Sequence, residues 1–157
     1  MAKKDLTDLK KFLKPFPGNV RENALWLREF VWDLYPDSNE LIYDNYNALA
    51  VGFGLSDKQG DIFCSIPVYA NYVHFGFYRG SEITDPKKML NGKGSLYRYI
   101  VINNKADFPQ AYIKKLLKEA YANAMARMKL KNVKQVLKGQ TITKSISPVK
   151  RRPCPVK

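Results

Sequence analysis

Apolar residues alternate with small or polar residues in three short stretches between residues 48 and 77, and this two-residue period is typical of β-strands. The first stretch reads ALAVGFGL from residue 48, and a turn at residues 56–60 follows it. Because successive side chains on a strand point to opposite faces, the alternation predicts which residues share a face of the sheet. We expect the core face to carry Leu49, Val51, Phe53, Ile62, Cys64, Ile66, Val73, Phe75 and Phe77.

The opposite face of these strands is predicted to hold small residues around a few polar and aromatic ones. Its members are Ala50, Gly52, Gly54, Ser65, His74, Gly76 and Tyr78. Glycine inside a strand often marks the close approach of a ligand or of another backbone. Two interpretations follow: a shallow ligand site, or a helix that packs closely on the glycines and covers a hydrogen-bonded His74. The candidate ligand-binding residues are Gly52, Gly54, Ser65, His74, Tyr78 and Arg98.

Arg98 belongs to a further predicted strand, residues 96–102, whose orientation the pattern leaves open because Arg98 shares a side with Ile100 and Ile102. On the His74 face, its guanidinium would suit a carboxylate or a phosphate. On the other face, it would bond backbone or acidic groups at the sheet edge. The preceding glycine–lysine–glycine loop at residues 92–94 is better explained by a hairpin turn than by an anion site.

The apolar period changes to three and four residues in three other segments, which predicts amphipathic helices. A short helix over residues 5–14 ends at a cluster of proline and glycine. A second begins at Asn19, where Glu22 completes a pattern resembling a capping box, and it ends near Tyr35. Asp107 is the expected N-cap of the last helix, whose apolar stripe is Ile113, Leu116, Leu117, Ala120, Tyr121, Ala124 and Met128.

These elements predict an α+β fold, an antiparallel β-sheet of about four to five strands with N-terminal and C-terminal helices packed on it. Residues 1–130 would form one domain, and residues 131–157 a basic tail, partly extended because of its β-branched residues at 141–146. No apolar run approaches the ~20 residues that cross a bilayer, and the first residues do not resemble a signal peptide. We therefore expect a cytoplasmic protein with two free thiols, Cys64 and Cys154.

The formal charge of +13 is concentrated at the end of the chain. Residues 1–107 hold 14 Lys and Arg against 13 Asp and Glu, whereas residues 108–157 hold 13 against Glu119 alone. Such a tail neutralises nucleic-acid phosphates or acidic lipid, or is simply solvated. Aromatic residues that would stack on bases are missing from the tail. The candidate nucleic-acid contacts are Lys144, Lys150, Arg151 and Arg152.

An acidic group spans the end of the second predicted helix and the loop after it. Its members are Asp33, Asp37, Glu40 and Asp44. Carboxylates are hard oxygen ligands that suit a divalent or ferric ion, although these four lack the spacing of a calcium-binding loop. The alternative is a solvated acidic surface.

Catalytic signatures are absent from the sequence, which favours a protein that is not an enzyme. There is no nucleophile elbow, no zinc-protease motif and no phosphate-binding P-loop. His74 is the sole histidine, and a thiol enzyme would need it within hydrogen-bond reach of Cys64. The alternation instead predicts that Cys64 and His74 lie on opposite faces.

Three segments in order resemble the YdhG-like family of domains of unknown function: ELIYDNYNALAVGFG at residues 40–54, YVHFGFYRGSEITDP at 72–86 and MLNGKGSLYRYI at 89–100. The resemblance covers residues 20–125 and implies a small α+β domain with helices packed on an antiparallel sheet. Some relatives bear a frataxin-like iron-chaperone label, which implies iron bound by carboxylates and delivered to cluster or haem assembly. Iron is expected on this resemblance only, and the chain departs from it in having a neutral body and a cationic end.

The leading functional hypothesis is a non-catalytic binding or adaptor module with a small ligand or a protein partner. One alternative is an intracellular iron-binding chaperone, by the family resemblance. The other is a nucleic-acid-associated basic protein that binds through its C-terminal tail.

Overall fold

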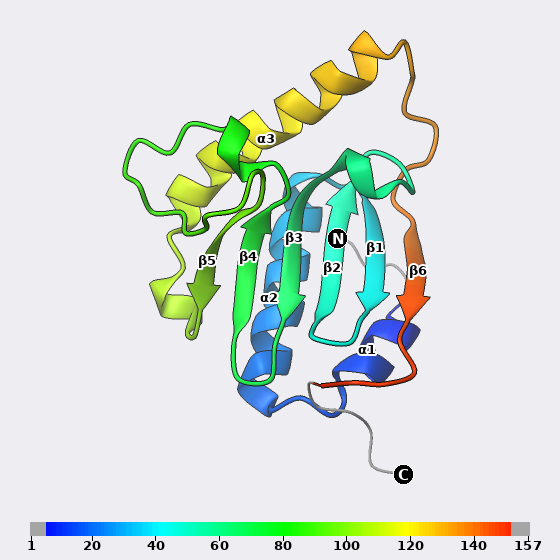
Figure 1. The fold of residues 1–157 in the computed structure, drawn as a ribbon, viewed down its shortest axis with the longest axis vertical. Coiled ribbons are helices and arrows are strands. Elements are labelled where there is room, and N and C mark those ends of the chain that lie inside the picture. The colour runs from blue at the N-terminus through cyan, green and yellow to red at the C-terminus, as the bar shows by residue number, and fades with distance from the viewer. Residues whose placement is uncertain (1–5, 152–157) are drawn as a thin grey trace.

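A computed structural model of the chain describes residues 6–151 and has the expected α+β architecture (Figure 1). The helices within these residues are α1 (Thr7–Leu13), α2 (Gly18–Leu34) and α3 (Gln110–Leu130). The strands are β1 (Asn39–Asp44), β2 (Leu49–Gly54), β3 (Ile62–Val68), β4 (Val73–Phe77), β5 (Arg98–Ile102) and β6 (Thr141–Ile146).

The strands form one sheet in the order β5-β4-β3-β2-β1-β6. Neighbours from β5 to β1 are antiparallel, whereas β6 runs parallel to β1. The sheet is therefore mixed, and it has one strand more than the upper end of the expected range. The sixth strand comes from the segment predicted as tail, because residues 141–146 pair with β1.

Strand β1 lies where the sequence predicts a loop. Leu41 and Ile42 are adjacent in the chain and both are fully buried. A strand that is buried on both faces does not alternate between apolar and polar residues, so its period gives no signal. Polar residues at both ends, Asn39 and Asp44, further obscure it.

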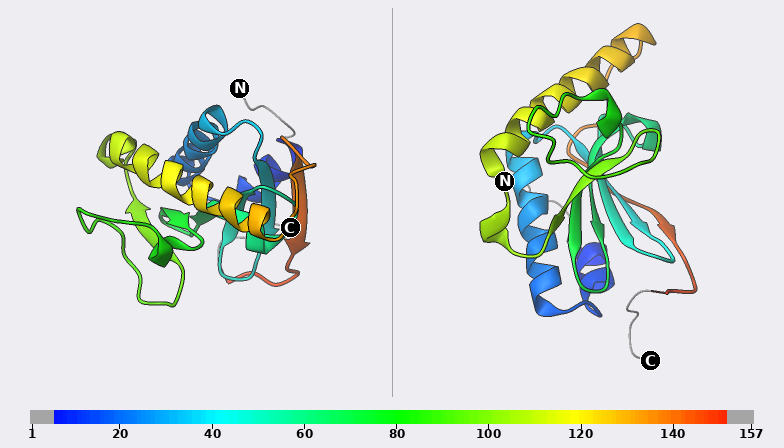
Figure 2. Two further views of the ribbon diagram at one scale, coloured as in Figure 1. Left: turned by 90° about the horizontal axis from the view of Figure 1, so that it is seen from above. Right: turned by 60° about the vertical axis from the view of Figure 1, so that its left-hand side comes forward.

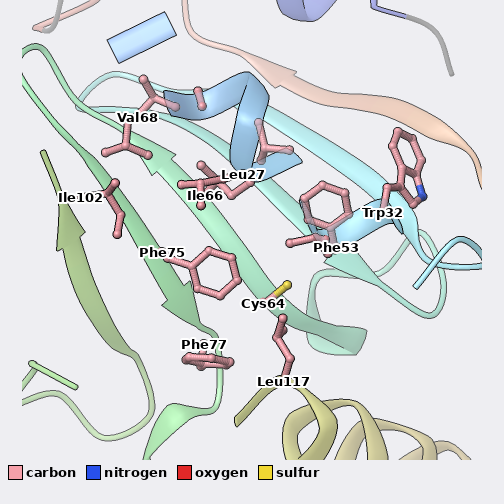
Figure 3. Close-up of a cluster of buried hydrophobic side chains, with 14 of the residues drawn as sticks. Leu27, Trp32, Phe53, Cys64, Ile66, Val68, Phe75, Phe77, Ile102 and Leu117 are labelled. Carbon is pink, nitrogen blue, oxygen red and sulfur yellow. The ribbon is translucent and has the colours of Figure 1, made fainter. Parts of the chain in front are cut away.

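The helices lie on one side of the sheet, where they bury the core (Figure 2). Helix α2 contacts β3 and β4, and α3 contacts β3. Cys64 lies within this core near Phe53 and Leu117 (Figure 3). The predicted core face is confirmed for eight of its nine residues, namely Leu49, Val51, Phe53, Cys64, Ile66, Val73, Phe75 and Phe77.

Ile62 is the exception, because a bulge changes the strand parity at the start of β3. Phe53 is paired with Cys64, but Gly54 is paired with Ile62, so Phe63 is the extra residue. Ile62 consequently lies over Gly52 on the other face. Phe63 packs instead with the helix-side rings of Tyr35 and Tyr121, at 5.6 and 5.2 Å between centroids.

Both predicted helix caps are wrong. Helix α2 begins at Gly18, and its N-cap, Pro17, makes no side-chain hydrogen bond to the helix. Asp107 ends a short 3-10 turn, Lys105–Asp107, and α3 begins after Pro109. None of the helices in residues 6–151 is long and apolar enough to cross a bilayer.

Candidate functional site: a tyrosine-rich sheet face

The face of the sheet opposite the helices, called the open face below, is defined by strand register. Gly52 is paired with Ser65, Ser65 with Gly76, and Gly76 with Tyr99. His74 is paired with Val101, so it belongs to the same face. Figure 2 shows α1, α2 and α3 on the other side of the sheet, whereas the 3-10 turn Gln59–Asp61 lies against Gly54 on this side.

The glycines of the open face leave room for this chain's own groups. A Cβ on Gly52 would lie 2.7 Å from Ile62 Cδ1, and one on Gly54 would lie 2.9 Å from the carbonyl oxygen of Asp61. A Cβ on Gly76 would collide with the ring of Tyr97. Asp61, Ile62 and Tyr97 thus occupy the space beside these glycines, so the interpretation of a helix packed on them is wrong, and a ligand site on this face stays a prediction.

Five rings form a continuous group on the open face, called the ring cluster: Tyr69, Tyr72, His74, Tyr97 and Tyr99. His74 and Tyr99 are stacked at 4.0 Å between ring centroids with 9° between planes. The Tyr72 and Tyr69 rings lie 5.4 and 4.8 Å from His74. Tyr97 is stacked on Tyr99 at 5.6 Å. The β3–β4 hairpin, β5 and the residue preceding β5 thus supply one aromatic surface.

Burial sets the protonation of this surface. Burial lowers the pKa of His74, which favours the neutral imidazole near pH 7. Burial also raises the pKa of Tyr97 and of Tyr69, so these hydroxyls stay protonated. His74, Tyr69 and Tyr97 are therefore uncharged at neutral pH.

Two buried polar atoms on the open face have no hydrogen-bond partner within the part of the chain that the structure describes. They are His74 Nδ1 and the Tyr43 hydroxyl. Tyr43 belongs to this face because it is paired with Ala50. Buried polar atoms are normally paired, so these two are positions for water or for a bound group.

Two of the predicted site residues are only loosely connected with the ring cluster. Arg98 is paired with Phe77 and so shares the helix side of the sheet. Its guanidinium donates to the carbonyl oxygens of Gly94 at 2.7 Å and Tyr97 at 2.8 Å. Tyr78 is half-buried and lies just beyond β4. The pKa of Tyr43 is raised mainly by the burial of Tyr43 and next by the nearby Tyr78 hydroxyl.

The cluster is exposed at the end of the sheet where β3 meets β4. Tyr72 is 37% exposed, and Val101 beside His74 is 43% exposed. An open groove there is lined by Tyr69, Tyr72 and Arg151, together with Asn47, Ala70 and Asn71. The structure therefore brings a cation of the C-terminal segment to the edge of the ring cluster.

The other predicted nucleic-acid contacts are placed differently. Lys150 forms an ion pair with Asp44 at 3.5 Å, and its ammonium donates to the carbonyl oxygen of Ser147. The backbone N–H of Arg151 donates to the carbonyl oxygen of Tyr46 at 2.9 Å, which fixes its position beside the groove. Lys144 lies in β6, and Arg152 lies outside the described residues.

The predicted metal-binding carboxylates are not brought together. Glu40 is fully buried and accepts hydrogen bonds from Arg28 at 2.6 and 3.0 Å and from Thr141 at 3.0 Å. Asp44 lies four strand residues further on, about 13 Å away at the rise of an extended chain. Within residues 6–151, no three His, Cys, Asp or Glu side chains are grouped to hold a metal ion, so the expected patch of Asp33, Asp37, Glu40 and Asp44 is wrong as one site.

Cys64 and His74 lie on opposite faces of the sheet, as predicted. The Cys64 side chain is fully buried in the core, and burial raises its pKa well above the usual value. Neither condition suits a nucleophile, which needs access and a thiolate.

The sequence reasoning missed Tyr69, Tyr72, Tyr97 and Tyr99 as site residues. The two-residue spacing could have indicated them, because it places Tyr72 on the same side of a strand as His74, and Tyr97 on the same side as Tyr99. Comparisons of the chain with protein-family models, with curated proteins and with solved structures found no match.

Proposed function

We propose that this protein is a non-catalytic binding module whose binding surface is the ring cluster on the open face. The observation that carries the proposal is the contact of His74 with three tyrosine rings on the side of the sheet opposite α1, α2 and α3: Tyr72 and Tyr99 are stacked on the imidazole and Tyr69 is tilted against it. A tyrosine presents an apolar ring face together with a hydroxyl that forms hydrogen bonds, which suits a surface for planar, partly polar groups.

The shape and polarity of the surface favour a planar ligand. Ile62 and Tyr97 fill the space beside Gly52 and Gly76, so the exposed part of the surface is the Tyr72 ring at the β3–β4 end of the sheet. The nearby groove is open, and two of its lining residues are Tyr69 and Tyr72. A ring laid on such a surface gains offset or edge-to-face aromatic contacts, about 0.5–1.5 kcal/mol for each pair. The unpartnered Nδ1 of His74 would direct its polar edge.

NMR titration with small probes tests the proposal. Uridine, adenosine and indole should shift the resonances of Tyr72, His74, Tyr99 and Val101, whereas methyl glucoside, which lacks an aromatic ring, should shift them much less. Replacing Tyr72 by Ala should weaken the response, and the resonances of Met125 on α3 give the matched control. Shifts that are absent, or that cluster away from the ring cluster, would overturn the proposal.

A further inference from the structure

We propose that the ring cluster and Arg151 together form an interface for single-stranded nucleic acid, with bases stacked on Tyr72 and its neighbours and a phosphate bound by Arg151. This inference rests on the proposed function of the ring cluster and adds the class of ligand. It starts from a juxtaposition that the sequence does not reveal, because residues 69–72 and residue 151 are far apart in the chain yet line one groove.

Among ligands with planar rings, the positive charge of the chain favours a polyanion. The net charge is +13, and beyond residue 119 there is no acidic residue at all. Near the groove, Asp44 is the carboxylate paired with Lys150 at 3.5 Å. Arg151 lies at the same end of the sheet, with its backbone bonded to Tyr46 and its side chain lining the groove. An arginine guanidinium binds phosphate oxygens through paired donors, which is stronger than a contact by a point charge.

The exposed ring of Tyr72 favours single strands over a duplex. Bases in a duplex are stacked on one another and present only their edges, whereas an unpaired base has a free π-face. A duplex groove is read by a protruding helix or ribbon, and none of α1, α2 and α3 lies on the open face. Tyr72 is the most exposed ring of the five and lies next to Arg151 along the groove, so it is the expected first stacking position.

The proposed arrangement also explains why the tail by itself is a poor candidate. The cationic segment after residue 129 contains no aromatic residue. In the structure that segment returns to the sheet as β6, parallel to β1, and then carries residues 147–151 to the end of β1 and the following turn. The folded chain thus supplies phosphate-binding and base-stacking groups from different segments.

Fluorescence anisotropy with a labelled 15-nucleotide oligo(dT) and the same strand annealed to oligo(dA) tests the inference. We expect the wild type to bind the single strand more tightly than the duplex. The Tyr72→Ala variant should lose about fivefold or more in affinity for the single strand, since stacking of one base contributes about 1–3 kcal/mol. The Tyr72→Phe variant keeps the ring and should stay within about twofold of the wild type.

Arg151→Ala gives a second, independent variant at an exposed position outside the core. It should weaken binding and reduce the slope of log affinity against log salt by about 0.7, the value for one phosphate of a single strand. Lys131→Ala removes the same charge at the end of α3, away from the groove lining, and should leave affinity within about twofold. Circular dichroism of each variant shows whether its fold is retained.

The outcomes separate this inference from the proposed function. Equal binding of single strand and duplex, or single-strand affinity that is unchanged in both Tyr72→Ala and Arg151→Ala, would overturn the inference. Binding of a heparin octasaccharide that equals oligo(dT) binding and ignores Tyr72 would also overturn it, because charge alone would then explain the affinity. If uridine and indole shift the ring cluster while oligo(dT) does not bind, the inference fails and the proposed function stands.

Discussion

Arg28 of α2 donates two hydrogen bonds to Glu40 of β1, from Nε at 2.6 Å and from Nη2 at 3.0 Å, and both side chains are buried. The pair joins α2 to β1, the strand that the sequence pattern does not predict. The Arg28 guanidinium also lies over the Trp32 ring at 4.8 Å, and Thr141 of β6 donates to Glu40 at 3.0 Å. One carboxylate therefore connects α2, β1 and β6.

Breaking this pair should be strongly destabilising. Replacing Glu40 by Gln leaves the Arg28 charge buried without its counter-ion, and we expect a loss of about 3–5 kcal/mol in the free energy of unfolding. Urea denaturation followed by circular dichroism measures the change.

The double variant Arg28→Met with Glu40→Leu is the matched control. It removes both charges and fills their space with apolar groups, so it should recover much of the stability lost in Glu40→Gln. A Glu40→Gln variant as stable as the wild type would show that the pair contributes little.

The glycines of the open face should differ in their tolerance of a methyl group. At Gly54, an added Cβ meets the backbone of Asp61 and Ile62, which has little freedom to move, so Gly54→Ala should cost about 1–3 kcal/mol. At Gly52, it meets the end of the Ile62 side chain, so Gly52→Ala should cost less, and an added Ile62→Val change should partly restore stability. The urea midpoints of Gly54→Ala, Gly52→Ala and the double variant with Ile62→Val measure the order of their stabilities.

Gly60→Ala is the control for these substitutions, because no heavy atom lies within 4 Å of its added Cβ. Its stability should stay within about 0.5 kcal/mol of the wild type. If Gly52→Ala were as damaging as Gly54→Ala, Ile62 could not move aside as we infer.

Cys64 should be inert to thiol reagents in the folded protein. Its side chain is fully buried on the helix side of the sheet, and burial raises its pKa, so both access and thiolate are lacking. In a Cys154→Ser background, Ellman's reagent should react with Cys64 only after unfolding in urea. Fast reaction under native conditions would contradict the placement of Cys64 in the core.

Alternation alone was sufficient to predict β2, β4 and most of β3, together with the opposite placement of Cys64 and His74. It failed at Ile62 because one bulged residue reverses the parity, and a bulge leaves no periodic signal. It left the face of Arg98 open because the pairing of Arg98 with Phe77 decides that face, and this pairing is not local. Strand β1 was hidden because Leu41 and Ile42 are buried on opposite faces.

The candidate site was predictable in its location but not in its chemistry. Glycines pointed to the open face, yet their space is taken by Ile62 and by Tyr97, which enters from the segment before β5. The sequence pattern could not show that Tyr97 and Tyr99 would meet Tyr72 and His74, since β4 and β5 are separated by some twenty residues. The same holds for Arg151, whose contact with the groove depends on the parallel pairing of β6 with β1.

The ring cluster should make the folded protein sensitive to acid. Burial lowers the pKa of His74 below its usual value near 6.5. Below about pH 6.5, His74 therefore binds a proton more readily in the unfolded chain than in the folded chain. Stability contributed by the neutral ring is therefore complete above this pH and is lost as the pH falls. Urea midpoints of the wild type and His74→Phe between pH 5 and 8 should diverge, with the wild type losing more stability at low pH. The Phe variant keeps an aromatic ring against Tyr72 and Tyr99 but cannot ionise, so other titrating groups cancel in the difference. Parallel curves for the two proteins would show that the His74 proton is bound equally well in the folded and unfolded states, contrary to its burial among the tyrosines.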